Sequence, residues 1–118
     1  MKIVSVYSGP DGESHFKDIE LTMKIEKSGT VSTTKPVKAT EAFFREAKGK
    51  DDVEWHTAPR KQLVIVLKGK LEIEVADGSK RQFGPGDVLL AEDTTGHGHL
   101  SRSSKRTGLY VPIEGDFT

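Results

Sequence analysis

Short runs of alternating hydrophobic and polar residues, separated by turn-forming sequences, dominate this chain. Residues 3–7 predict a first strand, which the turn-rich stretch 8–12 ends. From Phe16 to Ile25 the apolar side chains fall largely at alternate positions, with charged residues and threonine between them. This period of two is typical of a half-buried strand, which we expect to stop at 27–29.

The middle of the chain is more polar. Residues 31–38 are rich in threonine and contain Pro36, which indicates an extended segment at a sheet edge. Residues 41–47 contain Glu and Ala, which favour a helix, but the short length and the paired Phe43 and Phe44 favour a strand. We interpret 48–54 as a charged loop.

The second half of the chain carries most of the β-branched and aliphatic residues. We expect Lys68-Gly69-Lys70 to form a hairpin turn between two strands, and residues 76–79 to form the next turn. The basic run 102–106 is interpreted as a solvated turn between two strands. Four apolar runs predict strands: 62–67, 71–75, 88–91 and 109–113.

Many short strands joined by tight turns predict an all-β sandwich or barrel. A chain of 118 residues has the size of one ordinary domain, so we expect a single domain over residues 1–118. We find no internal repeat that would divide it.

The amino-acid composition argues against several classes of function. Lys plus Arg and Asp plus Glu number 18 each, so nothing steers the chain toward nucleic acid or an anionic membrane. No apolar run approaches the ~18 residues of a membrane-spanning helix. The absence of cysteine excludes disulfides, thiolate metal ligands and a cysteine nucleophile. We expect a cytoplasmic protein.

The spacing of a few residues carries the most specific signal. His56 is followed by Gln62 and Gly69, and the segment Gly84-Pro85-Gly86-Asp87 is followed by His97. This arrangement resembles the two-part signature of the cupin superfamily, in which the first part contains His-x-His, Glu and Gly and the second contains Pro-x-Gly, His and Asn. The resemblance implies a cupin-type jelly-roll β-barrel with a ligand or metal site in the barrel mouth.

The chain departs from that signature at several positions, including two where the family has a metal ligand. Ala58 stands where the family has its second His, and Gln62 stands where it has a carboxylate. In the second part, Glu92, Thr94 and Ser101 replace the family's Pro, Gly and Asn. The framework is therefore kept while the chemistry is changed.

The resemblance implies a reduced metal set of His56, Gln62 and His97. These three neutral ligands could hold Zn, Mn, Fe, Ni or Cu only with help from water or another side chain. His99 could be this helper, because it shares a face with His97 if the segment is extended. If the turn is longer by two residues, His99 rather than His97 would be the inward ligand. Gly98 permits a loop in which that alternation fails. The other reading is a metal-free pocket in which these polar residues bind a small molecule.

Other polar residues have more ordinary readings. His15 is expected at the surface, and Trp55 should face away from its neighbour His56. Arg60 and Lys61 could bind an anionic substrate, but they fit better as rim charges in ion pairs. Glu92 and Asp93 are an acid/base pair only if a turn brings them together, because adjacent residues on a strand point to opposite sides.

Three function hypotheses remain open at this level, since one fold hosts many activities. The first is a small metal-dependent cupin enzyme such as a dioxygenase, isomerase or lyase. The second is a metal-free ligand-binding or regulatory module. The third is a metal-free enzyme that uses His56 or His97 as general base with Glu92 as partner. Small cupins are commonly dimers, so the resemblance also implies a homodimer.

Overall fold

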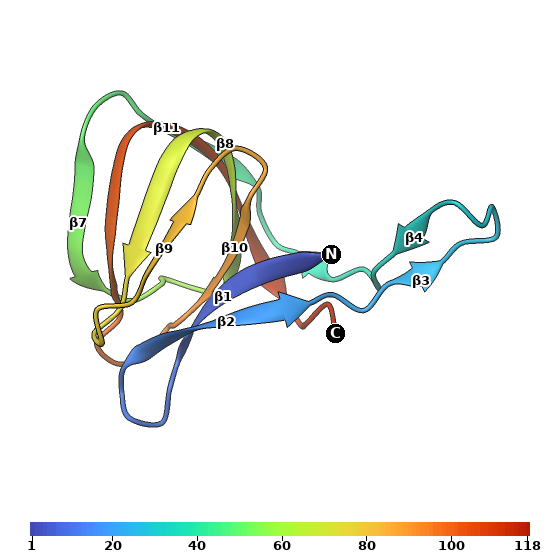
Figure 1. Ribbon diagram of the computed structural model, residues 1–118, viewed down its shortest axis with the longest axis horizontal. Coiled ribbons are helices and arrows are strands. Elements are labelled where there is room, and N and C mark those ends of the chain that lie inside the picture. Colours follow the sequence, from blue (N-terminus) through green and yellow to red (C-terminus); the bar gives the residue numbers. More distant parts are fainter.

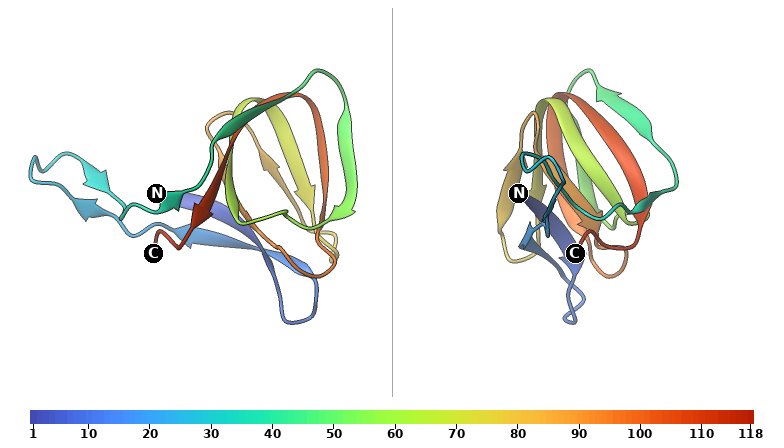
Figure 2. Two further views of the ribbon diagram at one scale, coloured as in Figure 1. Left: turned by 180° about the vertical axis from the view of Figure 1, so that it is seen from behind. Right: turned by 90° about the vertical axis from the view of Figure 1, so that its right-hand side faces the viewer.

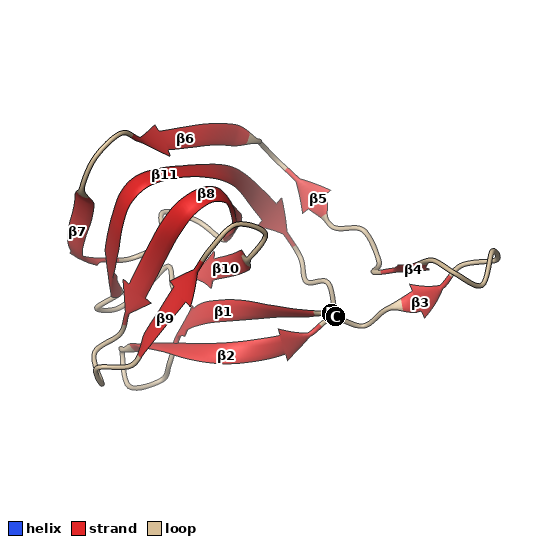
Figure 3. Cartoon of the chain, turned by 45° about the horizontal axis from the view of Figure 1, so that its top comes forward, coloured by secondary structure: helices blue, strands red, loops and turns tan.

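Segments in which apolar and polar residues alternate form β-strands, and the chain contains no helix. The computed structural model describes residues 1–118 and contains eleven strands and no helix (Figures 1 and 3). It holds no helix that could span a membrane. The strands are β1 (Lys2–Ser8), β2 (Ser14–Glu20), β3 (Lys24–Ile25), β4 (Ser32–Thr33), β5 (Lys38–Ala39), β6 (Phe43–Ala47), β7 (Asp51–His56), β8 (Gln62–Glu74), β9 (Lys80–Phe83), β10 (Val88–Glu92) and β11 (His99–Glu114).

Nine strands form one strongly curled sheet, so the prediction of an all-β barrel of the jelly-roll type is confirmed. The order is β2-β1-β10-β8-β11-β5, with β1 parallel to β10. Strands β8 and β11 pair along most of their length and form the spine of the sheet. On the outer edge of β11 lie β7, β6 and β5 in succession, and on the outer edge of β8 lie β9 and β10 (Figure 3).

The spine bends because both of its strands contain an irregularity at the same level. Gly69 has a φ of +77°, and a Cβ there would lie 2.2 Å from the carbonyl oxygen of Lys105. The pairing register shifts between Ser104 and Gly108 on β11. The buried positions of β8 accordingly change from even numbers, as at Val64, to odd numbers, as at Ile73.

Two predicted turns are therefore wrong. Residues 68–70 do not close a hairpin but form the bend of the continuous strand β8, and 102–106 is part of β11 rather than a solvated turn. The glycine and the charged residues at the bend have the composition of a turn, and a bulge uses the same residue types. The turn at 76–79 is confirmed by the hydrogen bond from Val75 N to Ser79 O.

The edges of the sheet also differ from expectation. The strand expected over 16–25 ends at Glu20, and β3 and β4 form a separate hairpin that projects from the body (Figures 1 and 2). The charged loop expected over 48–54 is wrong from Asp51 onward, because β7 pairs with β11 as an edge strand with exposed charges. The strand preferred over a helix at 41–47 is confirmed as β6.

Strand alternation divides the core between the two faces of the sheet. On β10, Leu89 packs into the larger cluster inside the curl, whereas Leu90 packs into a smaller cluster on the outer face. The larger cluster includes residues from both arms of the bent β8, such as Val64 and Ile73. The curl therefore encloses an apolar interior, and the functional groups lie along its unfilled part.

We predict that Gly69→Ala destabilises the protein far more than Gly29→Ala. Both glycines have positive φ values, 77° and 79°, but a Cβ at Gly29 meets nothing within 4 Å. Positive φ alone should lower the free energy of unfolding by about 1–2 kcal/mol, and the added clash with Lys105 should raise the loss to about 3 kcal/mol or more. Urea denaturation of both variants measures the difference. Equal losses would contradict the close approach of β8 and β11 at the bend.

Candidate functional site

A cavity of about 250 Å³ lies inside the curl of the sheet. Apolar residues of both arms of β8 and of β10 form much of its wall, among them Val64, Leu71 and Leu89. The polar residues that line it are Arg45, Asp51, His56, Gln62, His99, Ser101, Arg106 and Tyr110. A concave cavity that combines apolar walls with polar groups is the usual form of a small-molecule site.

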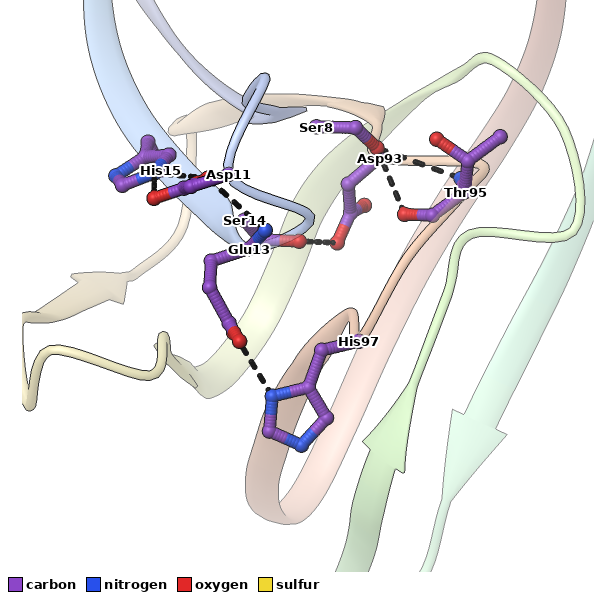
Figure 4. Close-up of polar contacts among 8 residues, drawn as sticks. All are labelled: Ser8, Asp11, Glu13, Ser14, His15, Asp93, Thr95 and His97. Atoms are coloured by element: carbon purple, nitrogen blue, oxygen red, sulfur yellow. Dashed lines mark hydrogen bonds and ion pairs between the residues drawn. The ribbon is translucent and has the colours of Figure 1, made fainter.

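His99 is held by a buried carboxylate. Its Nδ1 lies 2.6 Å from Oδ2 of Asp93, and the Ser14 hydroxyl donates to the same oxygen at 2.6 Å. Figure 4 shows the Ser14–Asp93 contact. Because a carboxylate accepts, the proton of a neutral His99 ring lies on Nδ1, and Nε2 is left with a free lone pair.

His56 is oriented in a similar way by the backbone. Its Nδ1 lies 2.7 Å from the carbonyl oxygen of Glu54, so Nδ1 donates and Nε2 is the accepting nitrogen. The centroids of the His56 and His99 rings are 4.5 Å apart. This close pairing requires Gly98, whose φ is +82° and whose Cβ would lie 1.9 Å from the His56 carbonyl oxygen.

Gln62 stands at the start of β8 and faces the cavity, as the alternation of its strand predicts. Its side chain is buried, with 7% of the residue exposed, and Oε1 has no hydrogen-bond partner. Ala58 lines the same cavity. The structure thus brings His56, Gln62 and His99 to one cavity.

His97 lies outside this group. Its Nδ1 is 2.8 Å from Oε2 of Glu13 at the surface (Figure 4), and its ring stacks on Trp55 at a centroid distance of 4.2 Å. Of the two alternatives left open by the sequence, His99 lines the cavity and His97 does not. The difference arises because Gly96 and Gly98 form a turn before β11 begins at His99.

The remaining candidates lie away from the cavity. Glu92 accepts a hydrogen bond of 2.5 Å from the Ser5 hydroxyl, while its neighbour Asp93 points inward, so the two carboxylates do not act as a pair. Glu92 makes no hydrogen bond with His56 or His97, whose Nδ1 atoms lie against the Glu54 carbonyl and the Glu13 carboxylate instead. His15 is a surface residue that contacts Asp11 at 2.8 Å.

The two cations at the rim are both engaged by carboxylates. Arg60 donates to Glu41 at 2.8 and 3.0 Å, and Lys61 contacts Asp116. The hydrogen bond from Arg60 holds the pKa of the Glu41 carboxyl below its usual value, and that from Lys61 does the same for the pKa of Asp116. Their interpretation as ion-pair residues rather than substrate ligands agrees with this geometry.

Sequence reasoning missed four polar residues of the cavity wall, namely Arg45, Asp51, Arg106 and Tyr110. Arg106, Gly108 and Tyr110 alternate on one face of β11, and that period of two was the available signal. The interpretation of 102–106 as a solvated turn concealed it. The Ser14–Asp93 contact spans 79 residues of sequence and had no local signal.

We predict that Asp93→Ala lowers the free energy of unfolding by about 2–3 kcal/mol, because it strands two buried donors on Ser14 and His99. Asp18→Ala is the matched control, since it removes only the exposed ion pair with Arg81 and should cost less than about 1 kcal/mol. Chemical denaturation checks both values. Similar small losses in the two variants would contradict the buried network.

Comparison with known proteins places these features in context. The family model described as "Cupin domain" matches residues 42–112. No curated protein matches the chain significantly. Among solved structures, the crystal structure of protein NMB1881 from Neisseria meningitidis is similar, with a TM-score of 0.49 and 14% sequence identity. That alignment covers 74% of this chain and 92% of the other.

Proposed function

The chain belongs to the cupin family, and from that premise we propose that it binds a small organic molecule in the cavity inside its curled sheet. The cavity volume of about 250 Å³ lies just below the range of drug-sized sites, which suits a small metabolite. Its walls offer apolar contacts together with polar groups that could fix the orientation of a ligand.

The observation that carries this proposal is the unpartnered amide oxygen of Gln62. A buried acceptor with no hydrogen bond costs about 1–3 kcal/mol of stability. Oε1 of Gln62 is such an acceptor, and it lies in the same cavity wall as His56 and His99. A ligand that donates a hydrogen bond to Gln62 would remove this cost on binding.

The side chains that line the cavity do not match a resident divalent metal. Close together they supply only the imidazoles of His56 and His99 and the amide oxygen of Gln62, because the one carboxylate in the lining, that of Asp51, forms no cluster with the two histidines. The structure has no cluster of three or more His, Cys, Asp or Glu side chains arranged to hold a metal. Metal sites with three protein ligands generally have three imidazoles or include a carboxylate or thiolate. The proposed binding therefore uses no metal.

Proton transfer is a second candidate function, which the His99–Asp93 pair favours. Asp93 holds the proton on Nδ1 at 2.6 Å, so Nε2 of His99 could accept a proton from a bound molecule. Asp93 would stabilise the resulting imidazolium. Exchange of an acidic C–H of a bound ligand with deuterium from solvent, in the wild type but not in His99→Gln, would support this activity.

We predict that Gln62→Met weakens ligand binding about tenfold without loss of stability, because one hydrogen bond is lost while a buried unpartnered oxygen is removed. Small fragments that shift the His56 and His99 ring signals in NMR spectra provide the ligands, and titration gives Kd. Gln82→Met, at an exposed position of strand β9, is the control and should leave Kd unchanged. A screen in which no fragment shifts these signals at millimolar concentration would refute cavity binding.

The proposal includes a homodimer that uses the projecting β3–β4 hairpin. Each of its strands has two residues, and such a small hairpin is marginal in water without further packing. Ile25 and Val31 are nevertheless exposed, by 62% and 49%. An apolar groove of about 310 Å³ that includes Met23 and Phe117 lies at the base of the hairpin. A second copy could cover both surfaces.

We predict that the double variant Ile25→Asp/Val31→Asp is a monomer at concentrations where the wild type is a dimer, because two buried charges would oppose association. Sedimentation equilibrium measures the masses. Phe44→Asp is the comparison variant, because Phe44 is 70% exposed on β6, away from the hairpin. Dissociation by Phe44→Asp but not by the hairpin variant would contradict this interface.

A further inference from the structure

The arginines of this chain divide into two groups. Three have a carboxylate partner within 4 Å: Arg60 with Glu41, Arg81 with Asp18, and Arg102 with Glu72 and Glu74. The other two, Arg45 and Arg106, have none, and both line the cavity. The two arginines that have no carboxylate within 4 Å, Arg45 and Arg106, therefore both line the proposed ligand site.

Arg106 is the more unusual of the two because it is buried. Only 6% of the residue is exposed, its Nε has no hydrogen-bond partner, and Nη1 donates to the Tyr110 hydroxyl at 2.7 Å. A buried cation without an anion is strongly unfavourable. Gly108 leaves space for it, since a Cβ there would lie 3.3 Å from Nη1.

Arg45 adds positive charge at the same place. It lies on β6 opposite Gly108, and the two guanidinium groups are 5.3 Å (Arg45) and 5.9 Å (Arg106) from the centroid of the Tyr110 ring. A second pocket adjoins these arginines and is lined by Lys48 and Lys50 as well, with Glu46 and Asp51 as its carboxylates. Lys50 is paired with Asp52 at 3.5 Å, and Asp51 also lines the main cavity, so the excess of positive charge comes from Arg45, Lys48 and Arg106 against Glu46 and Asp51. This excess would attract an anion.

We infer that the ligand of this cavity is a small organic acid whose carboxylate binds Arg106, with Arg45 as the second, exposed cation. This inference rests on the proposed ligand-binding function and specifies its ligand class. A planar guanidinium binds a carboxylate through two parallel hydrogen bonds, and Nε of Arg106 is free to supply one of them. The rest of the acid lies against the apolar wall, toward His56 and His99.

A purely structural role for Arg106 makes a different prediction about stability. If the hydrogen bond to Tyr110 were its purpose, Arg106→Met would destabilise the fold. If Arg106 is kept for an anionic ligand, replacing a buried unpaired charge with an apolar side chain of similar length should leave the melting temperature unchanged or raise it. Ligand affinity and stability should then change in opposite directions.

The test compares acids with their uncharged amides. Binding of butyrate, butyramide, benzoate and benzamide is titrated by NMR, with the Arg106 Nε–H and the His56 and His99 ring signals as reporters. At least one acid should bind at least tenfold more tightly than its amide, and Arg106→Met should abolish that preference. Arg102→Met, on the same strand but paired with Glu72 and Glu74, is the matched control and should keep it.

The outcomes separate this inference from the function on which it rests. Amides that bind as tightly as acids would overturn the carboxylate assignment and leave small-molecule binding intact. An acid preference that survives in Arg106→Met would also overturn it. Failure of all four probes to shift the cavity signals would count against both. A lower melting temperature for Arg106→Met with unchanged acid binding would assign Arg106 a structural role instead.

Discussion

The cavity of this protein depends on the joint bend of β8 and β11. If these two strands were straight, the sheet would be open and its inner face would lie in solvent. Gly69 has no Cβ, so the backbone of β8 can lie close to the carbonyl of Lys105 on β11. Both strands therefore bend at the same level. The bend places Val64 and Ile73, on the two arms of one strand, in a single apolar cluster. The ligand site is the part of this enclosed space that side chains do not fill.

The fold could be predicted from the sequence largely because most strands carry their own alternating pattern. Residues 71–75 alternate in the sequence, and Leu71 and Ile73 are buried. The errors fall where a bulge and a turn use the same residues, as at Gly69, and where an edge strand carries exposed charges, as in 51–56. A bulge also changes whether the even-numbered or the odd-numbered residues of a strand face inward. The alternation before the bend therefore did not predict which residues are buried after it.

The candidate site could be predicted only in part, for the same physical reason. His56 and Gln62 belong to positions that family spacing indicates, and both line the cavity. The choice between His97 and His99 depended on the backbone at Gly98, whose positive φ the sequence permits but does not require. Asp93 and Ser14 are brought together by the pairing of distant strands. No local pattern encodes such a contact.

Two groups of polar residues in the cavity suggest how a ligand would be oriented. At one end, His56, His99 and Gln62 present neutral atoms, two imidazole nitrogens and an amide oxygen, which accept hydrogen bonds. At the other, Arg106 and Arg45 present donors with positive charge, and the Asp51 carboxylate lines the same two pockets as these arginines. A molecule with an anionic group and a separate hydrogen-bond donor could make both sets of contacts in only one orientation. The same arrangement would place the donor, and any acidic proton near it, beside His99, whose Nδ1 is already held by Asp93.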